Sequence, residues 1–210
     1  MRKSLSRIKL YSSYFRLSSS NKNDYADWWR RGFLSPAPHF VKMNVLTQYK
    51  SIELWIETGT FMGDTSEVLA KRYPKVITIE PDPKLYARAA IRFLNVSNLE
   101  VVNGLSELTL EGILQKAEFE RIDSVGLWLD GHFSEGITFK GPLQTPIIKE
   151  LEIIEKFNGK FKNVYIFIDD FRSFVNGEIE YPKPNYLVDW AVRGNFSWEV
   201  QHDIFVMRSH

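Results

Sequence analysis

LWIETGTFMG at residues 54–63 and VITIE at residues 76–80 are the most informative stretches of this chain. In both, an apolar run ends in an acidic residue, and the first run continues into a turn with two glycines. Parallel α/β sheets use this order of strand, glycine turn, helix and second strand to form a nucleoside-binding crevice. The two stretches therefore predict a site for a nucleotide-like cofactor.

Outward from these stretches, apolar runs alternate with helical patterns along most of the chain. The alternation predicts an α/β fold with a doubly wound, mostly parallel, Rossmann-like sheet. Two short strand-like runs near the end predict an antiparallel C-terminal hairpin. The predicted strands cover residues 52–56, 76–79, 99–102, 125–129, 164–168, 196–200 and 204–207.

Local signals also predict where two helices begin. Asp82 and Thr145 each stand before a proline, an arrangement typical of a capping side chain followed by a first-turn proline. In the second helix, four apolar residues recur with helical spacing and predict one buried face. They are Ile147, Ile148, Leu151 and Ile154.

Composition limits the possible classes of protein. The chain has 210 residues, of which 44% are hydrophobic and 25% charged, as expected for one ordinary globular domain. A net charge of +1 provides no global attraction to nucleic acid, so we expect no nucleic-acid partner. The absence of cysteine excludes disulfides and thiolate metal sites and fits a cytoplasmic location. No run approaches the ~18 apolar residues of a membrane span.

The chain divides into three predicted segments, namely a basic N-terminal arm over residues 1–23, a helical cap segment over 24–50 and the main domain over 51–210. The arm has five basic residues in its first twenty positions and no acidic residue before Asp24. We interpret it as a mobile or peripheral tail, with a targeting presequence or a contact to an anionic surface as alternatives. Trp28 and Trp29 are expected to pack on the edge of the domain.

The glycine turn suggests how the cofactor is bound. Gly59 and Gly63 allow the backbone to turn and to approach a ligand closely. Glu80, at the end of the next strand, could accept hydrogen bonds from both hydroxyls of a ribose. The spacing differs from the G-x-G-x-x-G fingerprint, which argues against a nicotinamide dehydrogenase.

The pattern E-x-G-x-F-x-G resembles class I S-adenosylmethionine-dependent methyltransferases, and more narrowly the metal-dependent O-methyltransferases of the catechol type. The resemblance continues in order through residues 77–80, 101–106, 129–132 and 168–170. The run DGHFSEGIT at residues 130–138 is similar to one in bacterial methyltransferase-like proteins of unassigned substrate. The resemblance implies S-adenosylmethionine as the cofactor. It also implies that Glu57, Gly59, Thr60 and Gly63 hold the methionine part, Glu80 the ribose and Ser106 the adenine, with Asp130 beside them.

Three acidic residues form a candidate metal site. Asp130 follows the fourth predicted strand, and Asp169 and Asp170 follow the fifth, so all three should meet at the carboxyl edge of a parallel sheet. Clustered carboxylates repel one another, and Mg²⁺ would relieve the repulsion and orient an acceptor. The alternative is that Asp169 and Asp170 cap the next segment or pair with Arg172.

His132, two residues after Asp130, is a candidate catalytic base, with stacking on the adenine or a solvent-facing position as alternatives. The lysine base of the catechol-type enzymes would fall at Phe133, whereas related sugar methyltransferases use a histidine near this position. Residues 133–141 form a polar, glycine-containing loop that we expect to line the acceptor pocket.

These features predict an S-adenosylmethionine-dependent O-methyltransferase that acts on a hydroxyl of a sugar or small metabolite. Asp130 and His132 would serve catalysis, with a divalent metal as a further component. We expect a small-molecule acceptor, and a homodimer stays open. A metal-dependent glycosyltransferase and a cofactor-binding module without catalysis are the alternative classes.

Overall fold

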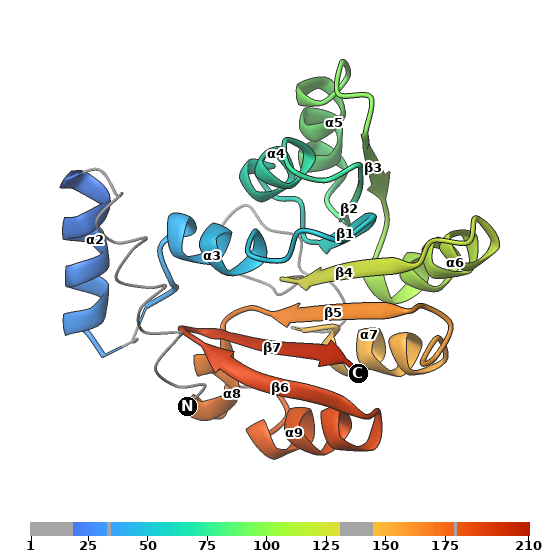
Figure 1. The fold of residues 1–210 in the computed structure, drawn as a ribbon. Helices are drawn as coiled ribbons and strands as arrows, with labels where there is room; N and C mark the ends of the chain where they lie inside the picture. The colour runs from blue at the N-terminus through green and yellow to red at the C-terminus, as the bar shows by residue number, and fades with distance from the viewer. Residues whose placement is uncertain (1–18, 33–34, 131–144, 179) are drawn as a thin grey trace.

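The computed structural model describes residues 19–32, 35–130, 145–178 and 180–210. Its strands are β1 (Leu54–Thr58), β2 (Lys75–Glu80), β3 (Leu99–Asn103), β4 (Ser124–Leu129), β5 (Asn163–Ile168), β6 (Phe196–Gln201) and β7 (Ile204–Ser209). They form one sheet in the order β3-β2-β1-β4-β5-β7-β6, in which β7 runs opposite to the other strands (Figure 1). The predicted fold class, including the C-terminal hairpin, is confirmed.

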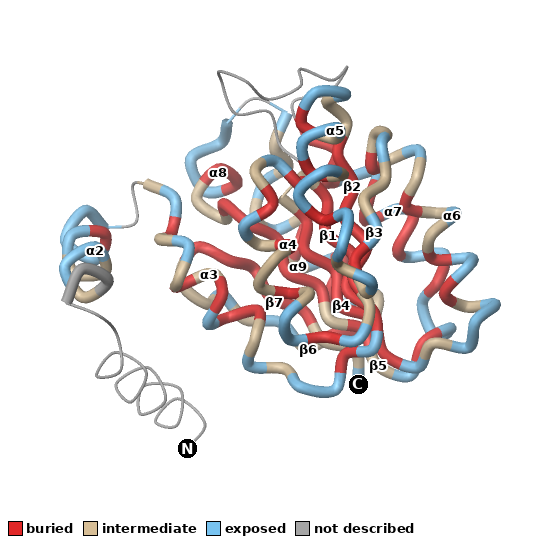
Figure 2. The backbone as a smooth tube through the Cα atoms, turned by 90° about the horizontal axis from the view of Figure 1, so that it is seen from above, coloured by how far each residue is buried: buried red, intermediate tan, exposed pale blue. Residues whose placement is uncertain are grey.

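Helices cover both faces of this sheet. Successive strand residues point to opposite faces, and Trp55 accordingly belongs to one core cluster while Leu54 and Ile56 belong to the other. The cluster that contains Trp55 packs against α3 (His39–Leu46), α4 (Asp64–Ala70) and α5 (Pro83–Arg92). The other cluster packs against α6 (Ser106–Phe119), α7 (Ile147–Glu155) and α9 (Pro184–Arg193). The central strands are consequently buried between two helical layers (Figure 2).

The strand predictions agree with the structure to within two residues at each end. The largest difference is at β1, which begins at Leu54 rather than at residue 52. Leu54 is the first residue that pairs with both β2 and β4. Ile52 is buried in the core ahead of that ladder, so its apolar side chain extended the predicted strand.

One of the two helix starts is confirmed as predicted. The carboxylate of Asp82 accepts hydrogen bonds from the backbone N–H groups of Lys84 (2.8 Å) and Leu85 (3.0 Å). In the other helix, Pro146 occupies the cap position and α7 begins at Ile147, one residue later than expected. The prediction that Ile148 shares the buried face of α7 is wrong, because its side chain is exposed while Glu150 is buried in that face.

Two further helices are present: α2 (Ser19–Arg30) precedes α3 in the chain, and α8 (Phe171–Asn176) follows β5. Trp28 on α2 is buried against Ala37 and Val41, as expected. Trp29 is not packed in this way, since 56% of it is exposed. Within the described residues, no helix is long and apolar enough to cross a membrane.

The strand order places one crevice at the centre of the sheet. From β1 the chain proceeds outward to β2 and β3, and then returns to the other side of β1 to form β4 and β5. Ligands of open α/β sheets bind outside the carboxyl ends of the strands at such a reversal. The ends of β1, β2, β4 and β5 therefore define the candidate site.

Candidate cofactor and acceptor site

The loop after β1 is a tight turn fastened to the end of β2. Gly59 and Gly63 have φ values of +87° and +84°, a left-handed conformation that favours glycine. A Cβ atom on Gly63 would lie 2.8 Å from the ring of Phe93, so a side chain is excluded by space as well. The backbone N–H of Gly59 donates to the carbonyl of Ile79 (3.0 Å), and the hydroxyls of Thr60 and Thr78 are 2.6 Å apart. These contacts hold the backbone groups of the loop in place just before α4 begins.

Glu80 joins the loop that follows β1 to the loop that follows β2. One oxygen of its carboxylate accepts the N–H of Phe61 (2.7 Å), and the other accepts the N–H of Asp82 (2.9 Å). Burial raises the pKa of Glu80, and these two N–H groups partly oppose the rise. Only 3% of the residue is exposed. Glu80 therefore fixes the loops in place, and its role toward a ribose stays a prediction.

Glu57 lies beneath the glycine loop. It is 1% exposed and accepts a hydrogen bond from the hydroxyl of Ser66 on α4. Burial raises the pKa of Glu57 to about 8, although hydrogen bonds from Ser66 and Thr78 act in the opposite direction. Glu57 therefore connects β1 to the start of α4. Its predicted contact with the methionine part of the cofactor stays a prediction.

The three predicted acidic residues do meet at the carboxyl edge. Asp130 follows β4, Asp169 and Asp170 follow β5, and one potential ligand atom from each lies within 4.8 Å of the others. Burial and the charge of Asp130 raise the pKa of Asp169, and the ammonium group of Lys42 opposes the rise. One oxygen of Asp169, Oδ1, is buried without a hydrogen-bond partner. The parallel topology is what brings these residues together.

Two cations pair with this cluster. Lys42 on α3 forms an ion pair with Oδ2 of Asp169. Arg172 donates to Asp170 (2.6 Å) and also pairs with Asp203 in the β6–β7 turn. The predicted alternative to metal binding, an ion pair with Arg172, is thus present for Asp170. A set of carboxylate oxygens suits Mg²⁺, but Asp169 and Asp170 already pair with protein cations, so the residues as arranged do not fit a divalent ion.

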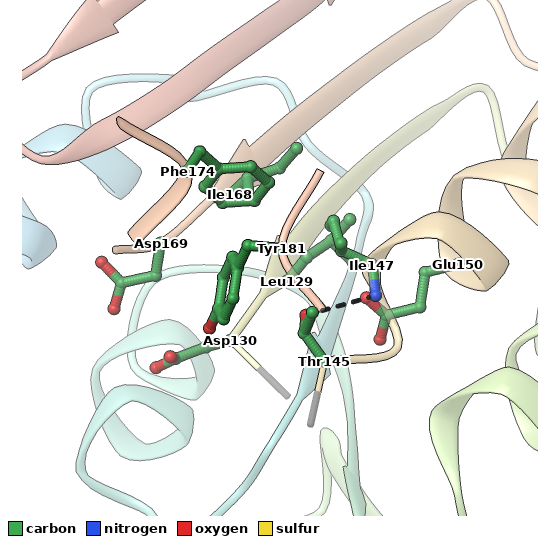
Figure 3. Close-up of a pocket in the computed structure, with 9 residues that line it drawn as sticks. All are labelled: Leu129, Asp130, Thr145, Ile147, Glu150, Ile168, Asp169, Phe174 and Tyr181. Carbon is green, nitrogen blue, oxygen red and sulfur yellow. Dashed lines mark hydrogen bonds between the residues drawn. The ribbon is translucent and has the colours of Figure 1, made fainter. Parts of the chain in front are cut away.

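A pocket opens between the ends of β4 and β5 (Figure 3). In this view the ring of Tyr181 stands between Asp130 and Asp169 on one side and Thr145 and Glu150 on the other. Glu150 is fully buried, and its Oε1 has no hydrogen-bond partner. Burial raises the pKa of Glu150 to about 7, while hydrogen bonds from Ser106 and Thr58 act in the opposite direction. The lining comprises Leu129, Asp130, Thr145, Ile147, Glu150, Ile168, Asp169, Phe174 and Tyr181.

The structure adds residues that the sequence pattern did not identify. Glu150 had a local signal, since it is a charged residue within the apolar stripe of α7. Lys42 had none, because it lies 127 positions from its partner Asp169.

Ser106 is buried at the start of α6 and interacts with Glu150, and its role toward an adenine stays a prediction. His132 and the whole predicted acceptor loop, residues 133–141, lie outside the described residues.

Comparison with known proteins gives two curated relatives with related names. A probable ribosomal RNA small subunit methyltransferase A from Methanosarcina barkeri is 30% identical over 134 residues, which are 62% of this chain and 44% of the relative. The protein of the same name from Methanosarcina acetivorans is 32% identical over 108 residues, or 51% of this chain and 37% of the relative. The chain thus spans less than half the length of these relatives. No family model matches it.

Solved structures agree on the fold. Fibrillarin from Aeropyrum pernix with bound S-adenosyl-L-methionine has a TM-score of 0.50 and 11% identity, over 81% of this chain and 74% of that one. The N-methyltransferase NodS from Bradyrhizobium japonicum has a TM-score of 0.50 and 12% identity, over 80% and 90%. The fold is that of the class I S-adenosylmethionine-dependent methyltransferases.

The comparisons correct one prediction. We expected a small-molecule acceptor and no nucleic-acid partner, and this expectation is wrong because both curated relatives are named as ribosomal RNA methyltransferases. The argument from a net charge of +1 failed because a sum over the chain does not report how the charges are distributed. The narrower resemblance to catechol-type or sugar O-methyltransferases is not supported by these relatives either.

Proposed function

We propose that this chain transfers the methyl group of S-adenosylmethionine to an N–H or O–H group of RNA. The observation that carries the proposal is the convergence of three features at the reversal of a methyltransferase-type sheet: the glycine loop held by Glu80, the buried Glu57 beneath it, and Asp130 beside the pocket. The names of the two curated relatives support RNA as the acceptor.

The residues at the carboxyl edge suit this cofactor. Gly59, Thr60 and Gly63 would present backbone groups to the methionine part, with Glu57 below them. Glu80 and Ser106 would lie along the ribose and adenine. When bound, the cofactor supplies an electrophilic methyl group on a positively charged sulfur, and S-adenosylhomocysteine is left after transfer.

The acceptor would enter beside Asp130. As the new bond to the methyl carbon forms, the acceptor atom must lose its proton, and Asp130 and His132 are the candidate proton acceptors. Holding the acceptor in line with the methyl group supplies much of the acceleration in such reactions. The basic arm, with Arg2, Lys3 and Arg7 among its residues, would add attraction to phosphates that salt weakens.

Calorimetric titration with S-adenosylhomocysteine, followed by transfer of labelled methyl groups, tests the proposal. We expect binding in the micromolar range and label in deproteinised small-subunit ribosomal RNA, decreasing as the salt concentration rises. Absence of cofactor binding would overturn the whole proposal, and binding of uridine diphosphate instead would favour a glycosyltransferase. Cofactor binding with label found only in a mixture of small hydroxylated metabolites would overturn the RNA acceptor alone.

Replacing Glu80 by alanine should weaken S-adenosylhomocysteine binding by about tenfold or more. The change removes the acceptor of the N–H groups of Phe61 and Asp82, and each lost hydrogen bond costs about 0.5–1.5 kcal/mol. Titration calorimetry measures the effect. Glu100→Ala, at an exposed position on the neighbouring strand β3, is the matched control. Equal affinities of the two variants would show that Glu80 does not organise the cofactor loops.

A further inference from the structure

We propose that Lys42 takes the place of a divalent metal in this site: its ammonium group positions Asp169, and the free oxygen of Asp169 accepts a hydrogen bond from the methyl acceptor. Lys42 is then a positioning residue and Asp169 a contact to the acceptor. The part of the inference that concerns the acceptor rests on the proposed function, whereas the part that concerns the metal does not.

The contacts of Lys42 direct its charge at the acidic cluster. The side chain is 15% exposed, and its Nζ pairs with Oδ2 of Asp169, whose side chain is fully buried. The same Nζ lies 5.8 Å from the ring centroid of Trp128, the residue before the last one of β4. An ammonium group over an aromatic face is attracted by the ring as well as by the carboxylate. Lys42 is thereby held by groups from both β4 and β5.

The charges around Lys42 favour its protonated form. Burial by itself would lower the pKa of Lys42, but the carboxylates of Asp169, Asp130 and Asp170 more than compensate, and its pKa lies above the ordinary value. The ion pair with Asp169 therefore places a cation at the three carboxylates that a metal would need. Mg²⁺ in the same place would have to displace Lys42 from Asp169 against electrostatic repulsion between the two cations.

The second oxygen of Asp169 indicates what the pair of Lys42 and Asp169 does in the site. Oδ1 is buried and has no partner, which is costly unless a ligand satisfies it. Asp169 lines the pocket together with Asp130 and Glu150, and Glu150 also has an unpartnered oxygen there (Figure 3). The unpartnered oxygen on the Asp169 side of Tyr181 suits a group that donates a hydrogen bond, such as an amino or hydroxyl group of the methyl acceptor.

Substitution of Lys42 by methionine tests the positioning role. We expect Lys42→Met to lower the rate of methyl transfer about 30-fold or more, because an unpaired buried carboxylate remains, while S-adenosylhomocysteine affinity changes less than about threefold. Lys42→Arg, which keeps the charge, should retain more activity than Lys42→Met. Lys50→Met, at an exposed position after α3, is the control. Equal loss of cofactor affinity and of transfer would overturn the positioning role, as would full activity of Lys42→Met.

A metal titration provides a readout independent of activity. The unfolding temperature of the wild-type chain should be the same in millimolar MgCl₂ and in EDTA, whereas Lys42→Met should be stabilised by Mg²⁺ because its carboxylates have lost their cation. Stabilisation of the wild type by Mg²⁺ would overturn the proposal, and so would a lack of any response in the folded variant. If the wild type fails to bind S-adenosylhomocysteine, the proposed function fails, but this titration still decides between Lys42 and a metal.

Discussion

Replacing Glu57 by glutamine should abolish the contribution of Glu57 to the loss of stability that the wild-type chain shows as the pH rises from about 4.5 to about 8. Burial raises the pKa of Glu57 from 4.5 to about 8. Between these values the folded chain keeps a proton that the unfolded chain has released, so the free energy of unfolding falls by about 1.4 kcal/mol per pH unit. Below the range both states are protonated, and above it both are ionised, so the loss stops. The total attributable to Glu57 is roughly 5 kcal/mol at most.

Urea unfolding at pH 5 and pH 8 measures this effect. Glu57→Gln keeps the shape of the side chain and the partner of Ser66 but cannot ionise, so the difference between the two pH values should shrink relative to the wild type. Glu100→Gln, at an exposed position on β3, should leave the difference unchanged. The same pH dependence in wild type and Glu57→Gln would show that the Glu57 carboxyl is solvated rather than enclosed beneath the glycine loop.

Replacing Phe167 by alanine should lower the free energy of unfolding by about 3–5 kcal/mol. Phe167 on β5 is fully buried, and its ring stacks on Trp55 with centroids 5.3 Å apart. It also meets Tyr49 edge to face at 5.4 Å. The substitution removes these contacts and leaves a cavity between β1, β5 and the segment after α3, which the surrounding side chains can fill only in part.

Comparing the chemical denaturation of Phe167→Ala with that of Phe119→Ala separates the effect of burial from the effect of replacing a phenylalanine. Phe119 is 88% exposed at the end of α6, so the same substitution there should change the free energy of unfolding by less than about 0.5 kcal/mol. A loss below about 1.5 kcal/mol for Phe167→Ala would mean that this face of the sheet repacks readily. Because Asp169 lies two residues further along, we also expect the variant to transfer the methyl group more slowly.

Much of the fold followed from local patterns. The runs at 76–79 and 125–129 predicted β2 and β4 closely because both faces of a central parallel strand are buried, which leaves a continuous apolar signature. The prediction for Ile148 failed because tertiary packing, rather than local spacing, decides which side of α7 is buried. Its spacing suits a helical stripe, but the packing of α7 on the sheet selects Glu150 for the buried side and leaves Ile148 outside.

The acceptor prediction failed for a different reason. Motif spacing around Glu57 and Glu80 reports on the cofactor site, which methyltransferases with unrelated acceptors share. The acceptor is selected by loops and peripheral segments that carry no such pattern. The two curated relatives supplied the information that corrected this prediction.

By itself, the sequence determined the class of fold, the position of the glycine loop and the convergence of Asp130, Asp169 and Asp170. The reason is that alternating strand and helix patterns predict a parallel sheet, whose strands end at one edge. Only the tertiary structure decided which charges face those carboxylates. Lys42 reaches Asp169 across 127 positions, and Arg172 joins Asp170 to Asp203 of the last hairpin. Pairing across such distances depends on how helices and turns pack on the finished sheet, and no local spacing encodes it.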